Sequence, residues 1–206
     1  MEDSFIKIGL LGGTFNPIHY GHLIIAEQIR ELFEFDNIVF IPSGIPPHKD
    51  INKVMGAQHR LAMVKLAVES NPNFWVSDVE SNRKGYTYTI DTLRGLRSTY
   101  EGETRFYFII GADNVQELVT WKEFRKVFGM CEFIATYRPG YDIKCTSLLI
   151  DQLKKDYMAR ITLVPALLID ISSTDIRRRV MEGRSIKYLV PEKVEEYIFK
   201  NNLYRG

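Results

Sequence analysis

The chain has 206 residues, of which 45% are hydrophobic and 26% charged, a composition typical of a folded globular protein. Its 27 basic and 26 acidic residues leave a formal net charge of +1, which argues against a long nucleic acid as partner, because such partners normally require a basic excess. We expect a cytoplasmic protein, since Met1-Glu2-Asp3 lacks the basic start of a signal peptide and no apolar run is long enough to span a membrane. Cys131 and Cys145 show no metal-site or redox spacing, so we expect two reduced thiols.

Short apolar runs alternate with segments of helical periodicity along the chain. This alternation predicts one α/β domain over residues 1–206, with a doubly wound, mostly parallel sheet, helices on both faces and a small C-terminal helical portion from about residue 173. Ligands bind such sheets beyond the carboxyl ends of the strands, so the loops after the strands should carry the chemistry. The predicted strands are 6–11, 37–41, 74–77, 105–110, 132–136 and 161–164, and the predicted helices are 23–33, 58–69, 89–100, 115–128 (as helical turns around Trp121), 146–158, 173–182 and 192–200.

The first predicted strand runs into the segment GGTFNPIHYGH, residues 12–22. His19 and His22 are three residues apart and share a face in the first turn of the next helix, where free N–H groups and the helix dipole favour anions. Each residue alone also suits an ordinary turn or polar surface, and the segment is neither a dinucleotide-binding GxGxxG motif nor a P-loop. Together these residues resemble the HxGH signature of the nucleotidyltransferase superfamily, and the extended segment resembles the bacterial nicotinate or nicotinamide mononucleotide adenylyltransferases. The resemblance implies a Rossmann-like nucleotidyltransferase fold, with ATP bound by Gly12, Gly13, Thr14, Phe15, His19 and His22.

The loop after the second predicted strand ends in Pro46-Pro47-His48-Lys49. Prolines stiffen it, and a lysine on a rigid backbone supplies a point charge for phosphate, although an exposed surface lysine is the simpler alternative. The family carries a PPHK segment at this place. By resemblance, Lys49 is a catalytic and mononucleotide-binding residue.

The third segment, residues 87–92 (TYTIDT), precedes a predicted helix. Thr87 or Thr89 suits the cap of that helix whatever the function. The segment is similar to the family's [S/T]YTxDT motif, which implies that Tyr88 and Thr89 bind the mononucleotide, Thr89 through contact with the pyridine carboxylate.

The fourth segment, residues 111–114 (GADN), again follows a strand. Asp113 is either a helix cap or an acceptor for ribose hydroxyls, and the GADN match favours the second. Trp121 is either a packing residue or, by resemblance to the bacterial enzymes, the ring that stacks on the pyridine. Lys122 departs from the aromatic residue that the family often has next.

The last segment is Ile171-Ser172-Ser173-Thr174-Asp175-Ile176-Arg177, which resembles the family's ISSTxIR motif. Its serines also suit a helix cap, and the arginine run suits a solvated surface. Hydroxyls, helix N–H groups and a guanidinium in one turn can however bind a polyphosphate. We therefore expect Arg177 to be the functional arginine and Arg178 and Arg179 to lie at the surface. The resemblance assigns ATP binding to Ser172, Ser173, Thr174 and Arg177.

The five segments span residues 12 to 177, and the resemblance implies adenylyl transfer from ATP to nicotinate mononucleotide, giving nicotinate adenine dinucleotide and pyrophosphate. The catalytic residues would be His19, His22, Lys49 and Arg177, with Mg²⁺ carried on ATP and no protein-held metal. The alternatives are the same reaction on nicotinamide mononucleotide, another HxGH transferase acting on phosphopantetheine or a cytidylyl acceptor, and an inactive nucleotide sensor. Beyond ATP and the mononucleotide, we expect neither nucleic acid nor membrane as partner, and the sequence leaves open whether the chain forms a homo-oligomer.

Overall fold

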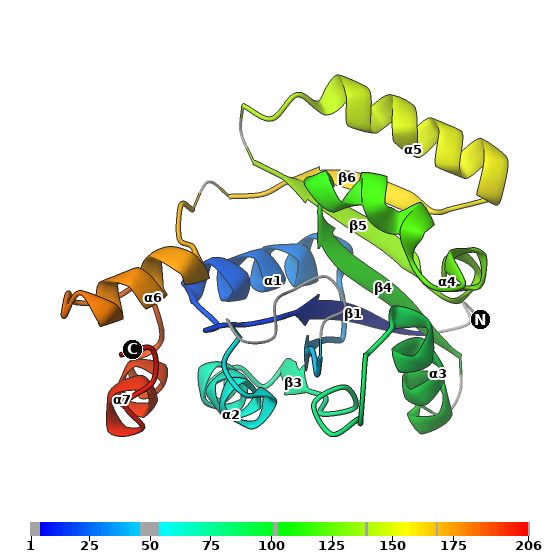
Figure 1. Cartoon of the computed structure of the whole chain (residues 1–206). Coiled ribbons are helices and arrows are strands. Elements are labelled where there is room, and N and C mark those ends of the chain that lie inside the picture. Colours follow the sequence, from blue (N-terminus) through cyan, green and yellow to red (C-terminus); the bar gives the residue numbers. More distant parts are fainter. Residues whose placement is uncertain (1–4, 46–53, 101–102, 139, 168, 206) are drawn as a thin grey trace. The chain divides into compact units, whose positions relative to one another are not determined.

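A computed structural model of the chain describes residues 5–45, 54–100, 103–138, 140–167 and 169–205. Within these residues the strands form a six-stranded parallel sheet in the order β3-β2-β1-β4-β5-β6, with helices around it (Figure 1). The order of strands reverses between β1 and β4, where doubly wound sheets bind their ligands. The predicted α/β fold class is confirmed. The elements are β1 (Ile6–Gly13), α1 (Tyr20–Phe33), β2 (Asn37–Pro42), α2 (Ala57–Val68), β3 (Phe74–Val76), α3 (Thr89–Thr99), β4 (Thr104–Gly111), the 3₁₀ helix η2 (Ala112–Thr120), α4 (Phe124–Met130), β5 (Glu132–Tyr137), α5 (Ile143–Tyr157), β6 (Ile161–Pro165), α6 (Ser173–Met181) and α7 (Glu192–Lys200).

One predicted helical stretch, residues 115–128, is wrong at its centre. The chain forms η2, leaves the helical conformation at Trp121 (φ −69°, ψ 144°), and starts α4 only after Glu123, whose φ of 53° lies in the left-handed region. Ion pairs from Arg94 and Lys126 to the Glu123 carboxylate accompany this turn. Periodicity could not reveal the interruption, because Trp121 and its neighbours contain neither proline nor glycine.

The chain divides into two compact units, each built from three segments. Unit 1 comprises Met1–Gly12, Gln28–Ile38 and Tyr88–Leu168. Unit 2 comprises Gly13–Glu27, Val39–Thr87 and Ile169–Gly206.

Unit 1 is built on the parallel strand pairs β1–β4, β4–β5 and β5–β6. Its core contains Ile8, Phe106 and Phe133, none more than 1% exposed, and burial of each such side chain contributes roughly 1.5–3 kcal/mol. Gly9 of β1 leaves room for the Phe35 ring, with which a Cβ would collide. Helix α5 runs beside β5 and β6, and packs on β6 and η2 (Figure 1).

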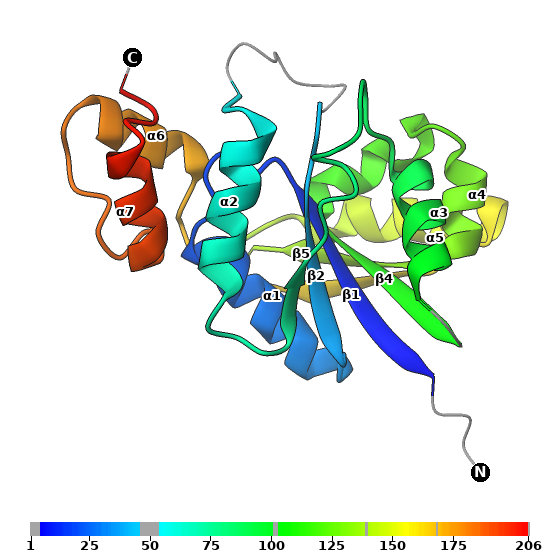
Figure 2. The same cartoon turned by 90° about the horizontal axis from the view of Figure 1, so that it is seen from below.

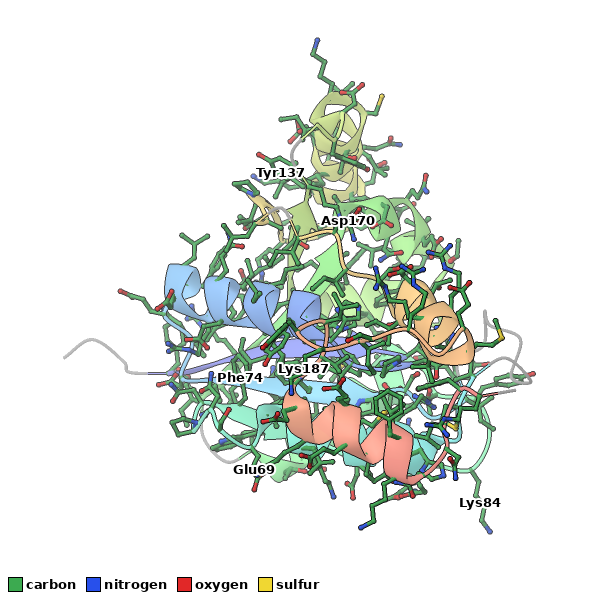
Figure 3. All side chains as sticks on the ribbon, turned by 90° about the vertical axis from the view of Figure 1, so that its left-hand side faces the viewer. Glu69, Phe74, Lys84, Tyr137, Asp170 and Lys187 are labelled. Carbon is green, nitrogen blue, oxygen red and sulfur yellow. The ribbon has the colours of Figure 1, made fainter. Side chains whose placement is uncertain are left out.

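Unit 2 is organised around α2, which packs against β3 and α7 (Figure 2). The helix buries Leu61, Met63 and Val64, as its apolar periodicity predicts. At the C-terminal end of α2, Glu69 (labelled in Figure 3) forms a 2.7 Å ion pair with Lys193 of α7. Both side chains are exposed, so this pair contributes at most about 1 kcal/mol. Across the described residues, the helices are too short or too polar to cross a membrane.

Candidate active site

The loop after β1 turns sharply in unit 2 and leads to the N-terminus of α1. Phe15 has a φ of 47°, a left-handed conformation that costs a non-glycine residue about 1–3 kcal/mol. Its ring is 2% exposed and lies edge-on to the His22 imidazole, with a centroid distance of 5.0 Å, and 6.0 Å from the Phe40 ring. Burial of the ring offsets the backbone strain, so packing holds the loop in this shape.

The two histidines of the loop stack on one another. The His19 and His22 ring centroids are 3.7 Å apart with an interplanar angle of 28°, so the expected shared face is confirmed. The His19 N–H donates to His22 Nδ1 at 3.3 Å, and the neutral tautomer that accepts at Nδ1 carries its proton on Nε2. A Cβ at Gly21 would lie 3.0 Å from His19 Nδ1, so glycine leaves room for the buried imidazole.

Helix α6 is attached by its first turn to the loop after β1. Ser172 caps the helix, because its Oγ accepts from the Asp175 N–H at 3.1 Å, as the sequence suggested. Ser173 Oγ donates to the Pro17 carbonyl at 2.8 Å. The positive end of the α6 dipole therefore lies beside the loop that leads into α1, within one unit.

Arg177 reaches the same loop from the second turn of α6. Its NH1 donates to the Asn16 carbonyl at 2.8 Å and its NH2 to Thr174 Oγ1 at 3.2 Å. These two bonds restrict the rotamers of the side chain and use only part of its five N–H groups. The guanidinium is thus held in place with donors left for an anion.

The next two arginines behave differently from Arg177. Arg178 and Arg179 both form ion pairs with Asp175 on their own helix, the second at 2.7 Å. The hydrogen bond from Arg179, with a further one from Arg178, lowers the pKa of the Asp175 carboxyl. Arg178 is exposed, and neither arginine hydrogen-bonds the loop after β1.

Apart from Lys49, the residues assigned to the mononucleotide lie in unit 1. Tyr88 occupies the N-cap position of α3 and Thr89 its first turn, but no side chain caps this end, so the expected threonine cap is wrong. The Tyr88 carbonyl accepts from the Asp91 N–H at 3.0 Å, and the Thr89 and Ile90 N–H groups lie at the helix N-terminus, where anions are favoured. The Lys122 ammonium lies 4.5 Å from the centre of the Tyr88 ring and 3.4 Å from Asp91 Oδ2.

Asp113 and Trp121 flank η2 in the same unit. Asp113 is exposed in the first turn, no side chain caps η2, and its carboxylate lies over Gly111, which has no Cβ to obstruct it. The half-buried Trp121 packs edge-on against Phe108 and Phe133, with centroid distances of 5.9 and 6.0 Å. The packing role considered for Trp121 is therefore real, and it fixes the orientation of the ring.

Two expected site residues fall outside these groups. Gly12 ends unit 1, where a Cβ would lie 3.0 Å from the Phe108 ring. Lys49, with Pro46, Pro47 and His48, lies outside the described residues. The structure brings together in unit 2 the following residues: Gly13, Thr14, Phe15, His19, His22, Ser172, Ser173, Thr174 and Arg177.

Three side chains that support this loop were not predicted from the sequence: Asn16, Arg60 and Tyr204. Asn16 Oδ1 accepts from the Tyr204 hydroxyl at 3.0 Å, and burial raises the pKa of that phenol. Arg60 is 1% exposed and donates to the Thr14 carbonyl at 2.7 Å. A signal existed for Arg60, which shares a helical face with the buried Val64, whereas nothing in the sequence distinguished Tyr204.

Comparisons with known proteins agree on one class. The cytidylyltransferase-like family model matches residues 10–179. A protein named "probable nicotinate-nucleotide adenylyltransferase" from Thermoanaerobacter sp. (strain X514) is 47% identical over 97% of this chain and 95% of its own length. A relative of the same name from Moorella thermoacetica is 46% identical over 97% of this chain and 92% of its own.

Solved structures share the fold at lower identity. The Plasmodium falciparum nicotinic acid mononucleotide adenylyltransferase complexed with NaAD has a TM-score of 0.78 and 22% identity, covering 97% of both chains. The same enzyme complexed with APC has a TM-score of 0.76, with the same identity and coverage. At this identity the likeness supports the fold alone.

Proposed function

This chain belongs to the nicotinate-nucleotide adenylyltransferase family, within the cytidylyltransferase-like class, and on that premise we propose that it transfers the adenylyl group of ATP to nicotinate mononucleotide. The products are nicotinate adenine dinucleotide and pyrophosphate, which places the reaction in NAD biosynthesis. Residues 1–206 act in this proposal as one nucleotidyltransferase domain with a small C-terminal helical portion from about residue 173, which is consistent with a relative that matches 97% of the chain.

The observation that carries the proposal is the attachment of α6 to the loop after β1. Arg177 and Ser173 bond directly to Asn16 and Pro17, two to six residues from the stacked histidines. Two helix N-termini, imidazole N–H groups and a guanidinium in one unit suit a polyphosphate, which carries several negative charges. Preorganised donors of this kind need no rearrangement when charge develops on the reacting phosphate.

The chemistry demands electrostatics and positioning more than proton transfer. A phosphate monoester has a second pKa of about 6, so the attacking oxygen of the mononucleotide is already anionic at neutral pH. Charge then builds on the α-phosphate and on the leaving pyrophosphate. His19 and His22 bind the ATP phosphates in this scheme, with His22 Nε2–H nearest the α-phosphate, while Arg177 and Lys49 neutralise the pyrophosphate.

Apart from Lys49, the residues that we assign to the mononucleotide belong to unit 1. Trp121 offers a ring already oriented by Phe108 for stacking on the pyridine, which has a flat apolar face. The uncapped first turn of α3 supports carboxylate binding at the Thr89 N–H, because helix N-termini favour anions. Asp113 would accept hydrogen bonds from ribose hydroxyls, and Lys49 would bind the 5′-phosphate.

Mg²⁺ enters the proposal as part of the ATP complex. No group of three or more histidine, cysteine or carboxylate side chains that could hold a metal occurs among the described residues. Among the described side chains of the loop and of the first turns of α1 and α6, the one carboxylate is Asp175, which pairs with Arg178 and Arg179. The hydrogen-bond donors of the other side chains fit phosphate oxygens better than they fit Mg²⁺, which prefers oxygen ligands. Mg²⁺ would lower the net negative charge of the triphosphate, and the donors of the loop after β1, α1 and α6 would bind the phosphate oxygens that Mg²⁺ does not coordinate.

A competitive turnover assay tests the function. Equal concentrations of nicotinate and nicotinamide mononucleotide are offered with MgATP, and both dinucleotides and pyrophosphate are quantified. The proposal predicts pyrophosphate in equal amount to dinucleotide and a large excess of the nicotinate product. A dominant nicotinamide product would overturn the choice of substrate, and the absence of pyrophosphate would favour a nucleotide sensor.

A further inference from the structure

Arg60 of α2 is a buried arginine to which adenylyl transfer, as described so far, gives no role. It is 1% exposed, and its Nε donates to the Met55 carbonyl at 2.7 Å, its NH1 to the Thr14 carbonyl at 2.7 Å and its NH2 to the Gly44 carbonyl at 2.9 Å. These acceptors belong to the loop after β1, the loop after β2 and the approach to α2. One guanidinium therefore joins three separate backbone segments of unit 2.

The acceptors of Arg60 are neutral carbonyls and not carboxylates. Burial lowers the pKa of the guanidinium, while Tyr204 and Glu80 act on it through space in the opposite direction, and an arginine remains protonated in proteins. An apolar side chain of similar volume would avoid the desolvation of a cation, so stability alone is a poor reason for arginine here. The geometry of a planar fork of donors, which no other side chain offers, is a better one.

The bond to Thr14 fixes a peptide plane in the loop after β1. In a trans peptide the C=O and the following N–H point in opposite directions, so the Phe15 N–H points away from Arg60. Phe15 also has the left-handed φ of 47°, a conformation that persists only when its surroundings enforce it. By the same geometry, the bond to Gly44 turns the Ile45 N–H away from the guanidinium.

Met55 extends this arrangement to Arg177. Its carbonyl accepts from Arg60, and its N–H donates to Asn16 Oδ1 at 3.2 Å. The carbonyl of Asn16 in turn accepts from Arg177 NH1 at 2.8 Å. Hydrogen bonds through Met55 and Asn16 thus connect the buried Arg60 to Arg177, the arginine assigned to pyrophosphate.

We infer that Arg60 is a positioning residue for adenylyl transfer: its forked donors hold the loops at Thr14, Gly44 and Met55 so that the loop after β1 and Arg177 present their donors to one triphosphate. The inference rests on the proposed function and adds a residue that touches neither substrate. A lysine in its place keeps the charge but offers one compact ammonium, which cannot bond three divergent carbonyls in a plane.

The test compares Arg60→Met, Arg60→Lys and Met63→Ala. Met63 lies one turn further along α2 and is 0% exposed, so its truncation is a matched control for lost stability without loss of the fork. For each variant, the melting temperature, kcat, the KM of both substrates and the Kd of α,β-methylene-ATP are measured well below melting.

Arg60→Met should lower kcat by roughly 100-fold and weaken binding of the analogue, because misplacement by about 1 Å can cost that much. The kcat of Arg60→Lys should stay at least about tenfold below wild type, and that of Met63→Ala within about twofold despite a lower melting temperature.

Recovery of wild-type kcat in Arg60→Lys would overturn the inference, as would equal losses of kcat in Arg60→Met and Met63→Ala. If Arg60→Met fails to fold, Arg60→Lys against Met63→Ala decides. An inactive wild type would instead refute the proposed function, and the affinities for the analogue would still test Arg60.

Discussion

The proposed triphosphate region of unit 2 and the proposed pyridine region of unit 1 are held in different ways. Around the loop after β1, distant segments donate hydrogen bonds to backbone carbonyls, as Arg177 does to Asn16 across 161 positions and Ser173 to Pro17 across 156. Around Trp121, the contacts are edge-on aromatic packing, as with Phe108, and exposed ion pairs, as between Lys122 and Asp91. Binding a polyphosphate requires fixed dipoles, whereas binding a flat ring requires an oriented apolar face, so each region has the kind of support that its proposed ligand requires.

The largest loss should come from His22→Ala in the triphosphate region. We expect kcat to fall by roughly 10²–10³-fold, because a positioned donor to the reacting phosphate is removed, while the melting temperature changes little. Steady-state pyrophosphate release at saturating substrates measures this. His59→Ala, which removes an imidazole bonded to the Tyr197 hydroxyl, is the control and should keep near-normal kcat. Unchanged turnover in His22→Ala would remove this histidine from the mechanism.

Arg177→Met should follow, with kcat lower by about 100-fold and a higher KM for ATP, because charge-assisted bonds to phosphate are lost. Arg178→Met is the matched control on the same helix and should remain within about twofold, since that side chain is exposed and pairs with Asp175. Similar losses in the two variants would mean that the arginine run acts only through its net charge. The KM values and turnover of both proteins are compared at one ionic strength.

Trp121→Ala should have a smaller effect and of another kind. Loss of ring stacking costs about 1–3 kcal/mol, so the KM for nicotinate mononucleotide should rise roughly 5- to 150-fold while the KM for ATP stays constant. Trp121→Phe retains a ring and should recover most of the affinity. Because Trp121 also packs on Phe108 and Phe133, the alanine variant should melt at a lower temperature. An unchanged KM together with a lower melting temperature would leave Trp121 a packing residue only.

The smallest expected change concerns Asp175, whose pKa is lowered from the ordinary 3.8, chiefly by the hydrogen bond from Arg179. A carboxyl whose folded pKa is depressed stabilises the fold above its unfolded pKa and loses that contribution as the pH falls through the folded value. Asp175→Asn should therefore melt slightly below wild type at pH 7, and the difference should shrink at pH 3. Calorimetry at both values measures this. A difference that grows on acidification would contradict the assigned ion pairs.

The fold was predictable because most strands are short apolar runs whose ends coincide with glycine or proline, as at Gly13 and Pro42. The sequence also predicted that the glycine-rich segment of residues 12–22 follows a strand, at the end of the sheet where doubly wound folds bind ligands. The contacts that support this loop from distant parts of the chain were not predictable, because Tyr204 hydrogen-bonds Asn16 from the opposite end of the sequence. At the left-handed turn, the Glu123 carboxylate accepts from Arg94, which lies 29 residues away, and no local sequence pattern reveals such a contact.

The most direct measurement is a crystal structure of the protein with α,β-methylene-ATP. The triphosphate oxygens should lie within hydrogen-bond distance of His22 Nε2, of the Arg177 guanidinium and of the Lys49 ammonium. A triphosphate bound away from the loop after β1, or one that contacts the histidines while Arg177 stays turned from it, would contradict the assignment of the triphosphate to this region.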